Sequence, residues 1–168
     1  MRHLIIFSFL VLFLGCNSSE KNTKKSLKEV AKEIIVASKN CTLITVDSTG
    51  VANARAMDPF LPNEDFTIFM ATNPKSAKVK EIQKNSKTTL YYFDAKTVGY
   101  VTLQGNSEIV NAKREKEKYW KNEWKNFYKN RTTDYVLIKF TPNKGNIISE
   151  KYSILGDSIT WKTPQLNF

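Results

Sequence analysis

The chain has 168 residues and a formal net charge of +10, from 26 lysines and arginines against 16 acidic residues. It contains two cysteines and one histidine, His3. This composition excludes a disulfide-rich framework and argues against catalytic triads and transition-metal sites that are built on imidazole. The length suits one domain with a substantial core, and the positive charge favours an anionic partner: nucleic acid, a membrane surface or an anionic cofactor.

Residues 1–15 have the pattern of a secretory signal peptide. Arg2 and His3 precede the apolar run LIIFSFLVLFLG, which is too short for a permanent membrane span. Gly15 and Cys16 follow directly and resemble the lipobox of bacterial lipoproteins, in which the lipidated Cys16 becomes the new N-terminus. An ordinary signal peptide or an uncleaved anchor with an incidental cysteine is the alternative interpretation.

Lipidation at Cys16 would anchor the protein to a membrane of the bacterial cell envelope, on its periplasmic or outer-surface side. Export of this kind argues against nucleic acid as a partner. Residues 16–25 are polar and lack apolar periodicity, which is typical of a flexible tether, and residues 26–168 form the single predicted domain. Removal of the leader also removes His3 and leaves Cys41 as an unpaired thiol, which we expect to be buried and inert.

The first half of the domain predicts a helix and three strands. Ser26 and Glu29 form a capping-box pattern at the start of a helix whose apolar stripe covers residues 27–35. Two strands joined by the turn DSTG follow, and a third strand comes after a loop. The three strands are predicted at residues 41–46, 51–57 and 66–72.

A second helix is predicted over residues 74–85, with Asn73 as its N-cap and Pro74 in the first helical position. Its inner face is predicted to carry Ala77, Val79 and Ile82. The start of a helix offers unpaired amides and the positive end of the helix dipole. Ser76 and Lys78 add a hydroxyl and an ammonium group, so the stretch predicts a phosphate-binding site.

The second half of the domain predicts a long hairpin, a charged helix and two more strands. The hairpin joins residues 87–94 to residues 99–110, and Gly105 marks a bulge or a close backbone approach. The charged helix is predicted over residues 112–130, with Tyr119, Trp120, Trp124 and Phe127 at helical spacing. The last strands are predicted at residues 134–140 and 146–154, before a frayed end. Seven short antiparallel strands favour a curled sheet, so we expect a mainly β member of the α+β class with flanking helices.

The order of these segments resembles a known family. The segments are ITVDSTGVANARAM, FMATNPKSAKVKEIQKN, TLYYFD, VTLQGNSEIV, a tryptophan-containing helix and DYVLIKFTP, and together they cover residues 28–145. They are similar to the general stress protein 26 branch of the pyridoxamine 5′-phosphate oxidase-like FMN-binding split barrels. The resemblance implies a six-stranded split β-barrel, a homodimer, and FMN in the two clefts between the protomers.

The resemblance also implies which residues hold the cofactor. Arg55 would reach the FMN phosphate from the second strand, with the backbone at Ala56 and Met57 beside the isoalloxazine ring. Thr72, Ser76 and Lys78 match the family's phosphate-binding positions, and Asn73 is their neighbouring cap. A phosphate dianion suits this set, because arginine binds it bidentately and lysine adds a point charge. Taken singly, each residue could equally be an ordinary helix or surface position.

Two aromatic positions are further candidates for contact with the flavin. Tyr100 lies where vitamin B6 oxidases carry a flavin-contacting glutamine, and Trp120 lies on the helix that lines the cofactor mouth in this branch. Core packing for Tyr92 and Tyr100, and interface packing for Trp120 and Trp124, are the alternatives.

The chain departs from the vitamin B6 oxidases at two places. Met57 is followed by Asp58-Pro59-Phe60 in place of their substrate lysine, and their C-terminal substrate motif is missing. We therefore expect a flavin-dependent oxidoreductase with an unknown substrate, an unknown small-molecule redox partner and no identified catalytic residue, because the flavin carries the chemistry. The alternatives are a non-enzymatic binder of FMN or haem, which would act as a sensor, scavenger or stress protein, and FAD or deazaflavin in the same cleft. A third reading is a basic domain that only docks on anionic lipid or glycan.

Overall fold

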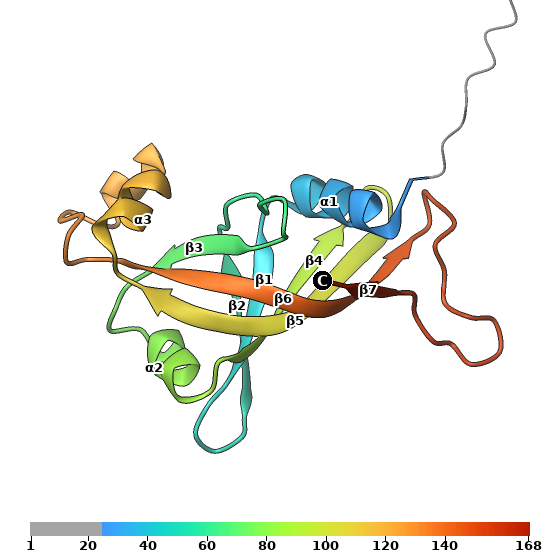
Figure 1. Ribbon diagram of the computed structural model, residues 1–168, viewed down its shortest axis with the longest axis horizontal. Coiled ribbons are helices and arrows are strands. Elements are labelled where there is room, and N and C mark those ends of the chain that lie inside the picture. Colours follow the sequence, from blue (N-terminus) through green and yellow to red (C-terminus); the bar gives the residue numbers. More distant parts are fainter. Residues whose placement is uncertain (1–24) are drawn as a thin grey trace, which may run out of the picture.

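Seven strands, three α-helices and one 3₁₀ helix make up residues 25–168, the part of the chain that the computed structural model describes (Figure 1). The predicted signal peptide, nearly all of the predicted tether and Cys16, the predicted lipidation site, lie outside these residues. The elements are α1 (Leu27–Ser38), β1 (Cys41–Val46), β2 (Ala52–Met57), β3 (Ile68–Thr72), α2 (Ala77–Lys84), β4 (Lys87–Asp94), β5 (Gly99–Val110), α3 (Lys113–Lys118), the 3₁₀ helix η1 (Asn122–Asn126), β6 (Val136–Ser149) and β7 (Gln165–Asn167).

All strands belong to one antiparallel sheet with the order β2-β1-β4-β5-β6-β3, to which β7 adds by pairing with β6. The edge strands β2 and β3 meet only through the loop that joins them: Pro59 bridges Met70, and the amide of Phe60 donates to the carbonyl of Phe69 at 2.7 Å. The curled sheet therefore stays open between β2 and β3. This arrangement confirms the predicted split barrel.

The inner face of the curled sheet forms the core together with α1. Ser26 and Glu29 make the predicted capping box, and the four buried residues of α1 are Val30, Ala31, Ile34 and Ile35. From the sheet, Leu43, Leu90 and Leu103 are fully buried register neighbours on β1, β4 and β5. Alternation on each strand thus directs one set of side chains inward and leaves the other set on the outer face.

The hairpin β4–β5 has the predicted bounds, but the last part of the sheet differs from the prediction. The two strands expected at residues 134–140 and 146–154 are one 14-residue strand, β6, which pairs with β5 along its length. The register shifts beside Gly105, where an added Cβ would lie 2.1 Å from the carbonyl oxygen of Thr141. The predicted bulge at Gly105 is thus confirmed. The bulge lets β6 bend and still continue as one strand. The sequence pattern did not show this continuity of β6.

Two further predictions for the C-terminal half were wrong. The chain end is not frayed, because β7 pairs with β6 and buries Leu166. The charged helix over residues 112–130 is replaced by the six-residue α3 and by η1. Tyr119 ends α3 and stacks on Phe69 of β3, with ring centroids 3.9 Å apart. Packing of the aromatic side chains against the sheet has overridden the helical periodicity, and Phe127 is left 77% exposed.

Candidate functional site

The end of β3 and the start of α2 bring three predicted phosphate-binding side chains into contact. Thr72 ends β3 and is almost fully buried. Its hydroxyl lies 3.2 Å from the Ser76 hydroxyl and accepts a hydrogen bond from Lys78 Nζ at 3.1 Å. These short contacts gather two hydroxyls and one ammonium group beside the first turn of α2.

The start of α2 lies three residues later than predicted. Ser76, and not Asn73, is the N-cap, and Pro74 belongs to the preceding turn. Asn73 instead accepts a hydrogen bond from the amide of Lys75 at 2.8 Å, which makes a local turn. Ala77, predicted on the inner face, is exposed, whereas Val79 and Ile82 are buried as predicted.

The shift has a chemical consequence for Ser76. Its side chain makes no capping hydrogen bond to α2 and points to Thr72 instead. The first turn of α2 also contains no acidic residue. Because the first amides of any helix lack intrahelical partners, this helix start retains donors and positive potential for an anion.

Arg55 reaches the same corner from the edge strand β2. It is a register partner of the fully buried Leu43, so it lies on the inner side of the sheet, and its side chain is 22% exposed. Its guanidinium donates to the Thr45 hydroxyl at 2.5 Å and pairs with Glu81 of α2 at 3.1 Å. Thr45 also donates to Glu81. Glu81 was not among the residues predicted from the sequence, because its position on the second turn of α2 gave no signal of a pairing with β2.

Electrostatics join these two groups into one site. Burial lowers the pKa of Lys78 below its ordinary value, and the nearby positive charge of Arg55 lowers this pKa further, whereas Glu81 raises it. Lys78 and Arg55 are therefore near enough to repel each other, and the Glu81 carboxylate pairs with Arg55 and also acts on Lys78. Two cations against one carboxylate give the corner a net positive charge and make it suitable for an anion. We call Arg55, Thr72, Ser76 and Lys78 the cationic corner.

Of the other predicted cofactor residues, Ala56 and Met57 follow Arg55 directly on β2, and Tyr100 lies on another strand. Ala56 is exposed on the outer face of β2, and Met57 packs partly against the core. Tyr100 lies on β5, three strands from β2, and is half-buried with its ring 5.8 Å from that of Tyr91. Tyr92 is fully buried in the core, as the alternative interpretation proposed.

Trp120 belongs to an aromatic cluster over β3 and the start of β6. Its ring lies 5.8 Å from that of the buried Trp124 and 5.2 Å from that of Tyr135, and the Arg131 guanidinium lies 4.4 Å from its centre. The Trp124 indole N–H donates to Asp58 at 3.2 Å. The departure from the vitamin B6 oxidases at Asp58 therefore has a structural role here, because this contact ties the loop after β2 to the aromatic cluster.

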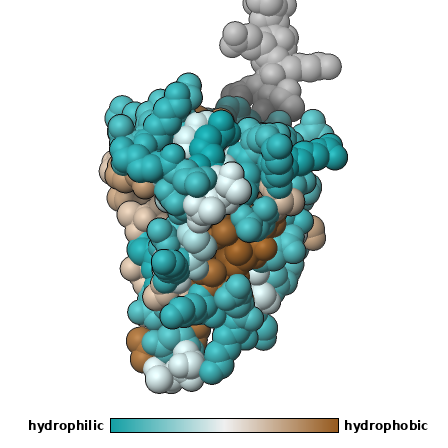
Figure 2. Space-filling view, turned by 90° about the vertical axis from the view of Figure 1, so that its left-hand side faces the viewer, coloured by the Kyte–Doolittle hydropathy of each residue, from teal (hydrophilic) through white to brown (hydrophobic). Residues whose placement is uncertain are grey.

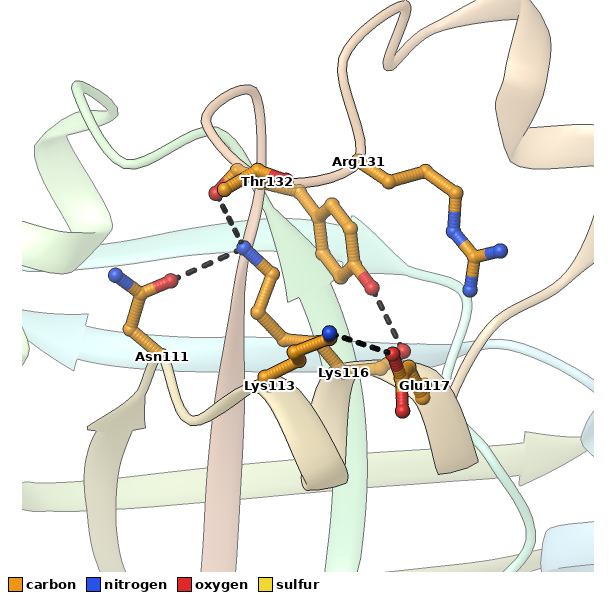
Figure 3. Close-up of a pocket in the computed structure, with 7 residues that line it drawn as sticks. Asn111, Lys113, Lys116, Glu117, Arg131 and Thr132 are labelled. Atoms are coloured by element: carbon orange, nitrogen blue, oxygen red, sulfur yellow. Dashed lines mark hydrogen bonds and ion pairs between the residues drawn. The ribbon is translucent and has the colours of Figure 1, made fainter.

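A hollow of about 310 Å³ lies beside this cluster (Figure 3). In it, the buried Lys116 donates to Asn111 Oδ1 at 3.0 Å and to the carbonyl of Thr132 at 2.7 Å. Tyr135 in turn donates to the carbonyl of Lys116 at 2.7 Å. Lys116 thus connects the two ends of the segment between β5 and β6 by hydrogen bonds. These bonds account for the burial of Lys116 without a ligand.

Figure 2 shows the end of the molecule that carries α2 and α3. Its surface is mostly hydrophilic, with an apolar patch near the centre. An apolar surface framed by polar groups is typical of ligand-binding faces.

In the part of the chain that the structure describes, no helix is both long and apolar enough to cross a membrane.

The open curled sheet, with a cationic corner between one of its edges and a helix start, defines a split-barrel protein. Residues 25–161 match the family model described as pyridoxamine 5′-phosphate oxidase like, and the chain belongs to this family. The resemblance predicted from the sequence is thereby confirmed. A search of curated proteins gave no match.

Solved structures agree on the fold. General stress protein 26 from Bacillus anthracis has 24% identity and a TM-score of 0.67, with 84% of this chain and 98% of that chain covered. A related protein from Clostridium acetobutylicum has 22% identity and a TM-score of 0.69, with 83% and 93% covered. An FMN-binding protein from Nostoc punctiforme, related to pyridoxamine 5′-phosphate oxidase, has 11% identity and a TM-score of 0.61, with 83% and 91% covered.

Proposed function

We propose that the cationic corner binds the phosphate of FMN and that the chain is an FMN-dependent oxidoreductase of unknown substrate. The observation that carries this proposal is that Arg55, Thr72, Ser76 and Lys78 come together from two sheet edges and one helix start. With the neighbouring Glu81 counted, this corner carries one net positive charge. The family membership supports it. When bound, the flavin would supply two-electron transfer, while the protein supplies position and exclusion of water.

The donor set fits a phosphate monoester, which carries close to two negative charges near neutral pH. Charge-assisted hydrogen bonds contribute about 1.5–3 kcal/mol each. Arg55 uses two of its nitrogens on Thr45 and Glu81 and retains other N–H groups for a ligand. Lys78 and the amides of α2 add further donors, so the corner can supply several such bonds. After the cost of ordering the ligand, they support binding in the micromolar range or better.

The cationic corner reaches only one part of the cofactor, and we propose that a second copy of the chain supplies the rest. Ala56 and Tyr91 are both register partners of Thr42, so all three lie on the outer face of the sheet, beside Tyr100. A homodimer built on this face would bring the partner's aromatic side chains towards the edge strand β2. We also propose that the protein is a lipoprotein of the bacterial cell envelope, attached through Cys16.

The experiment starts with the chain from Lys25 onward, which contains the whole core described above. We expect the purified protein to show flavin absorbance, or to quench the fluorescence of added FMN. Combined Ser76→Ala and Lys78→Ala substitutions are expected to weaken FMN at least tenfold, or about 1.4 kcal/mol. Lys80→Ala removes one charge from the exposed side of the same helix and is the matched control, with an expected change below about twofold.

An unchanged dissociation constant in the double variant, with its circular dichroism unaltered, would remove these residues from the site. A colourless protein that leaves FMN fluorescence unchanged would refute flavin binding altogether. Non-enzymatic storage or sensing is the second candidate, because no acid or base is evident among the four side chains of the corner. Rapid bleaching of the bound flavin by a nicotinamide cofactor favours the enzyme, and failure with all reductants favours the non-enzymatic binder.

A further inference from the structure

The segment between β6 and β7 exposes large apolar side chains at the end of the molecule opposite α2 and α3 (Figure 1). Leu155, Ile159 and Trp161 have exposed fractions of 57%, 86% and 82%. Single exposed apolar residues are common on protein surfaces, but three within seven positions of one loop form a concentrated apolar feature. We call residues 155–162 the apolar loop.

Hydrogen bonds within the apolar loop hold these side chains outward. The Asp157 carboxylate accepts from the amides of Ile159 and Thr160 at 3.1 and 2.7 Å, and from the Thr160 hydroxyl at 2.9 Å. The amide of Asp157 donates to the carbonyl of Lys162 at 3.0 Å, and the amide of Trp161 donates to the carbonyl of Asp157 at 2.9 Å. The loop is a built turn that presents its apolar groups to the surroundings.

Trp161 also has a backbone that a bulky residue rarely adopts, with φ at 59°. Glycine or asparagine would adopt this left-handed conformation with less strain. An indole at a strained, exposed position contributes little to the fold. Such an outlier indicates a functional reason for the side chain.

The apolar loop continues from a segment that contacts the start of α1. Lys25 Nζ donates to the Tyr152 hydroxyl at 3.3 Å, and Tyr152 donates to Glu33 of α1. Figure 1 shows the first turn of α1 on the same side of the molecule as the apolar loop. The eight residues between Cys16 and Lys25 could span about 30 Å when extended. A lipid on Cys16 would therefore keep this end of the domain near a membrane surface.

Positive charge accompanies the apolar groups. A hollow of about 640 Å³ lies between α1 and the residues at 94–97 and 149–152. Its charged lining residues are Lys32, Lys39, Lys96 and Lys151, against Glu33 and Asp94. Within the apolar loop itself, the charges of Lys162 and Asp157 offset each other, so the net positive charge comes from the lysines around the hollow. This balance favours a surface of anionic headgroups.

We propose that the apolar loop inserts into the headgroup region of an anionic lipid bilayer, with Trp161 and Ile159 as its anchoring side chains. Tryptophan suits this depth because its ring is apolar and its N–H is polar. The insertion would fix the orientation of a domain that a tether alone would leave free, and it would turn the cationic corner away from the membrane. The proposal does not depend on flavin binding.

The test uses the full chain in vesicles of phosphatidylcholine and phosphatidylglycerol in which the lipid acyl chains carry bromine near the headgroup. Bromine quenches tryptophan fluorescence only at contact, so we expect quenching of the native chain and at least a threefold loss of it in Trp161→Phe. The matched control adds Phe127→Trp to Trp161→Phe, because Phe127 is 77% exposed and follows η1, next to α3. This relocated tryptophan is expected to remain unquenched.

Three results would overturn the proposal. The first is a native chain without quenching, and the second is equal quenching of the relocated tryptophan, which would show a domain without fixed orientation. The third result would show that the apolar loop contacts a second copy of the chain instead of a lipid bilayer. If the lipid-free chain from Lys25 onward shows a Trp161 emission that shifts to shorter wavelength as protein concentration rises, the apolar loop is a contact between copies. Weaker quenching in vesicles of phosphatidylcholine alone would support the role of the lysines.

Discussion

Substitution of Gly105 by alanine tests how closely the backbones of β5 and β6 approach each other at the bulge. The new Cβ would lie 2.1 Å from the carbonyl oxygen of Thr141 and 2.7 Å from Pro142 Cα. Both contacts are with backbone atoms, so no side-chain rotation relieves them. Overpacking in a well-packed region costs about 1–3 kcal/mol, and we expect Gly105→Ala to reach the upper end of that range.

Gly50 provides a matched glycine where steric contact plays no part. Its φ is 88°, and an added Cβ would meet nothing within 4 Å. Gly50→Ala should therefore cost only the left-handed conformation, about 1–2 kcal/mol. The free energy of unfolding of both variants, measured by urea denaturation, separates the two causes. For a domain of this size, a loss of about 3 kcal/mol lowers the melting temperature by about 6–12 °C.

Equal losses in the two glycine variants would refute the close approach of β5 and β6. We expect Gly105→Ala to lower the free energy of unfolding without changing the slope of its dependence on urea concentration, because the fold should be retained. Gly105 lies on β5 and is not a residue of the cationic corner. We therefore expect weaker FMN binding in Gly105→Ala only where the domain has begun to unfold.

Two further predictions concern the charges and the thiol. The side chains of Arg55 and Glu81 are 22% and 10% exposed. A double-mutant cycle of Arg55→Met and Glu81→Gln should therefore give a coupling free energy of about 1–2 kcal/mol. A coupling free energy below about 0.3 kcal/mol would contradict the ion pair. Burial raises the pKa of the Cys41 thiol to about 12. Labelling of Cys41 by a thiol reagent at pH 8 should therefore proceed only through unfolding, and the labelling rate should increase as pH approaches 12. Labelling at the rate of a free thiol would show that Cys41 is accessible.

Local patterns were sufficient to predict most of the sheet. The strands at residues 41–46, 87–94 and 99–110 have the predicted bounds, because alternation, turn residues and burial all agree there. The prediction failed where distant segments decide the structure. The helix predicted over residues 112–130 had a helical aromatic spacing, but Tyr119 and Trp120 pack against β3 and the start of β6, while Phe127 stays exposed. No property of the segment itself identifies that surface.

The candidate site shows the same division between local and long-range information. Ser76 and Lys78 lie near each other in sequence, so their proximity to Thr72 follows from one turn after a strand. Arg55 comes to this corner only because the sheet curls and α2 packs near β1. The resemblance to the family supplied that long-range information. It did not predict Glu81, because a single acidic residue on a short helix carries no sign of its partner on another strand.

Glu81 changes how the cationic corner should work. Without a ligand, Arg55 and Lys78 repel each other, and the Glu81 carboxylate offsets part of that repulsion while it holds the guanidinium between β2 and α2. A phosphate that enters the corner would bring two further negative charges and would also favour the protonated form of Lys78. The arginine would then be positioned before the ligand arrives, so little side-chain ordering would accompany binding. On this reasoning Glu81 is a positioning residue, whose loss would be expected to loosen Arg55 even though it removes a competing negative charge.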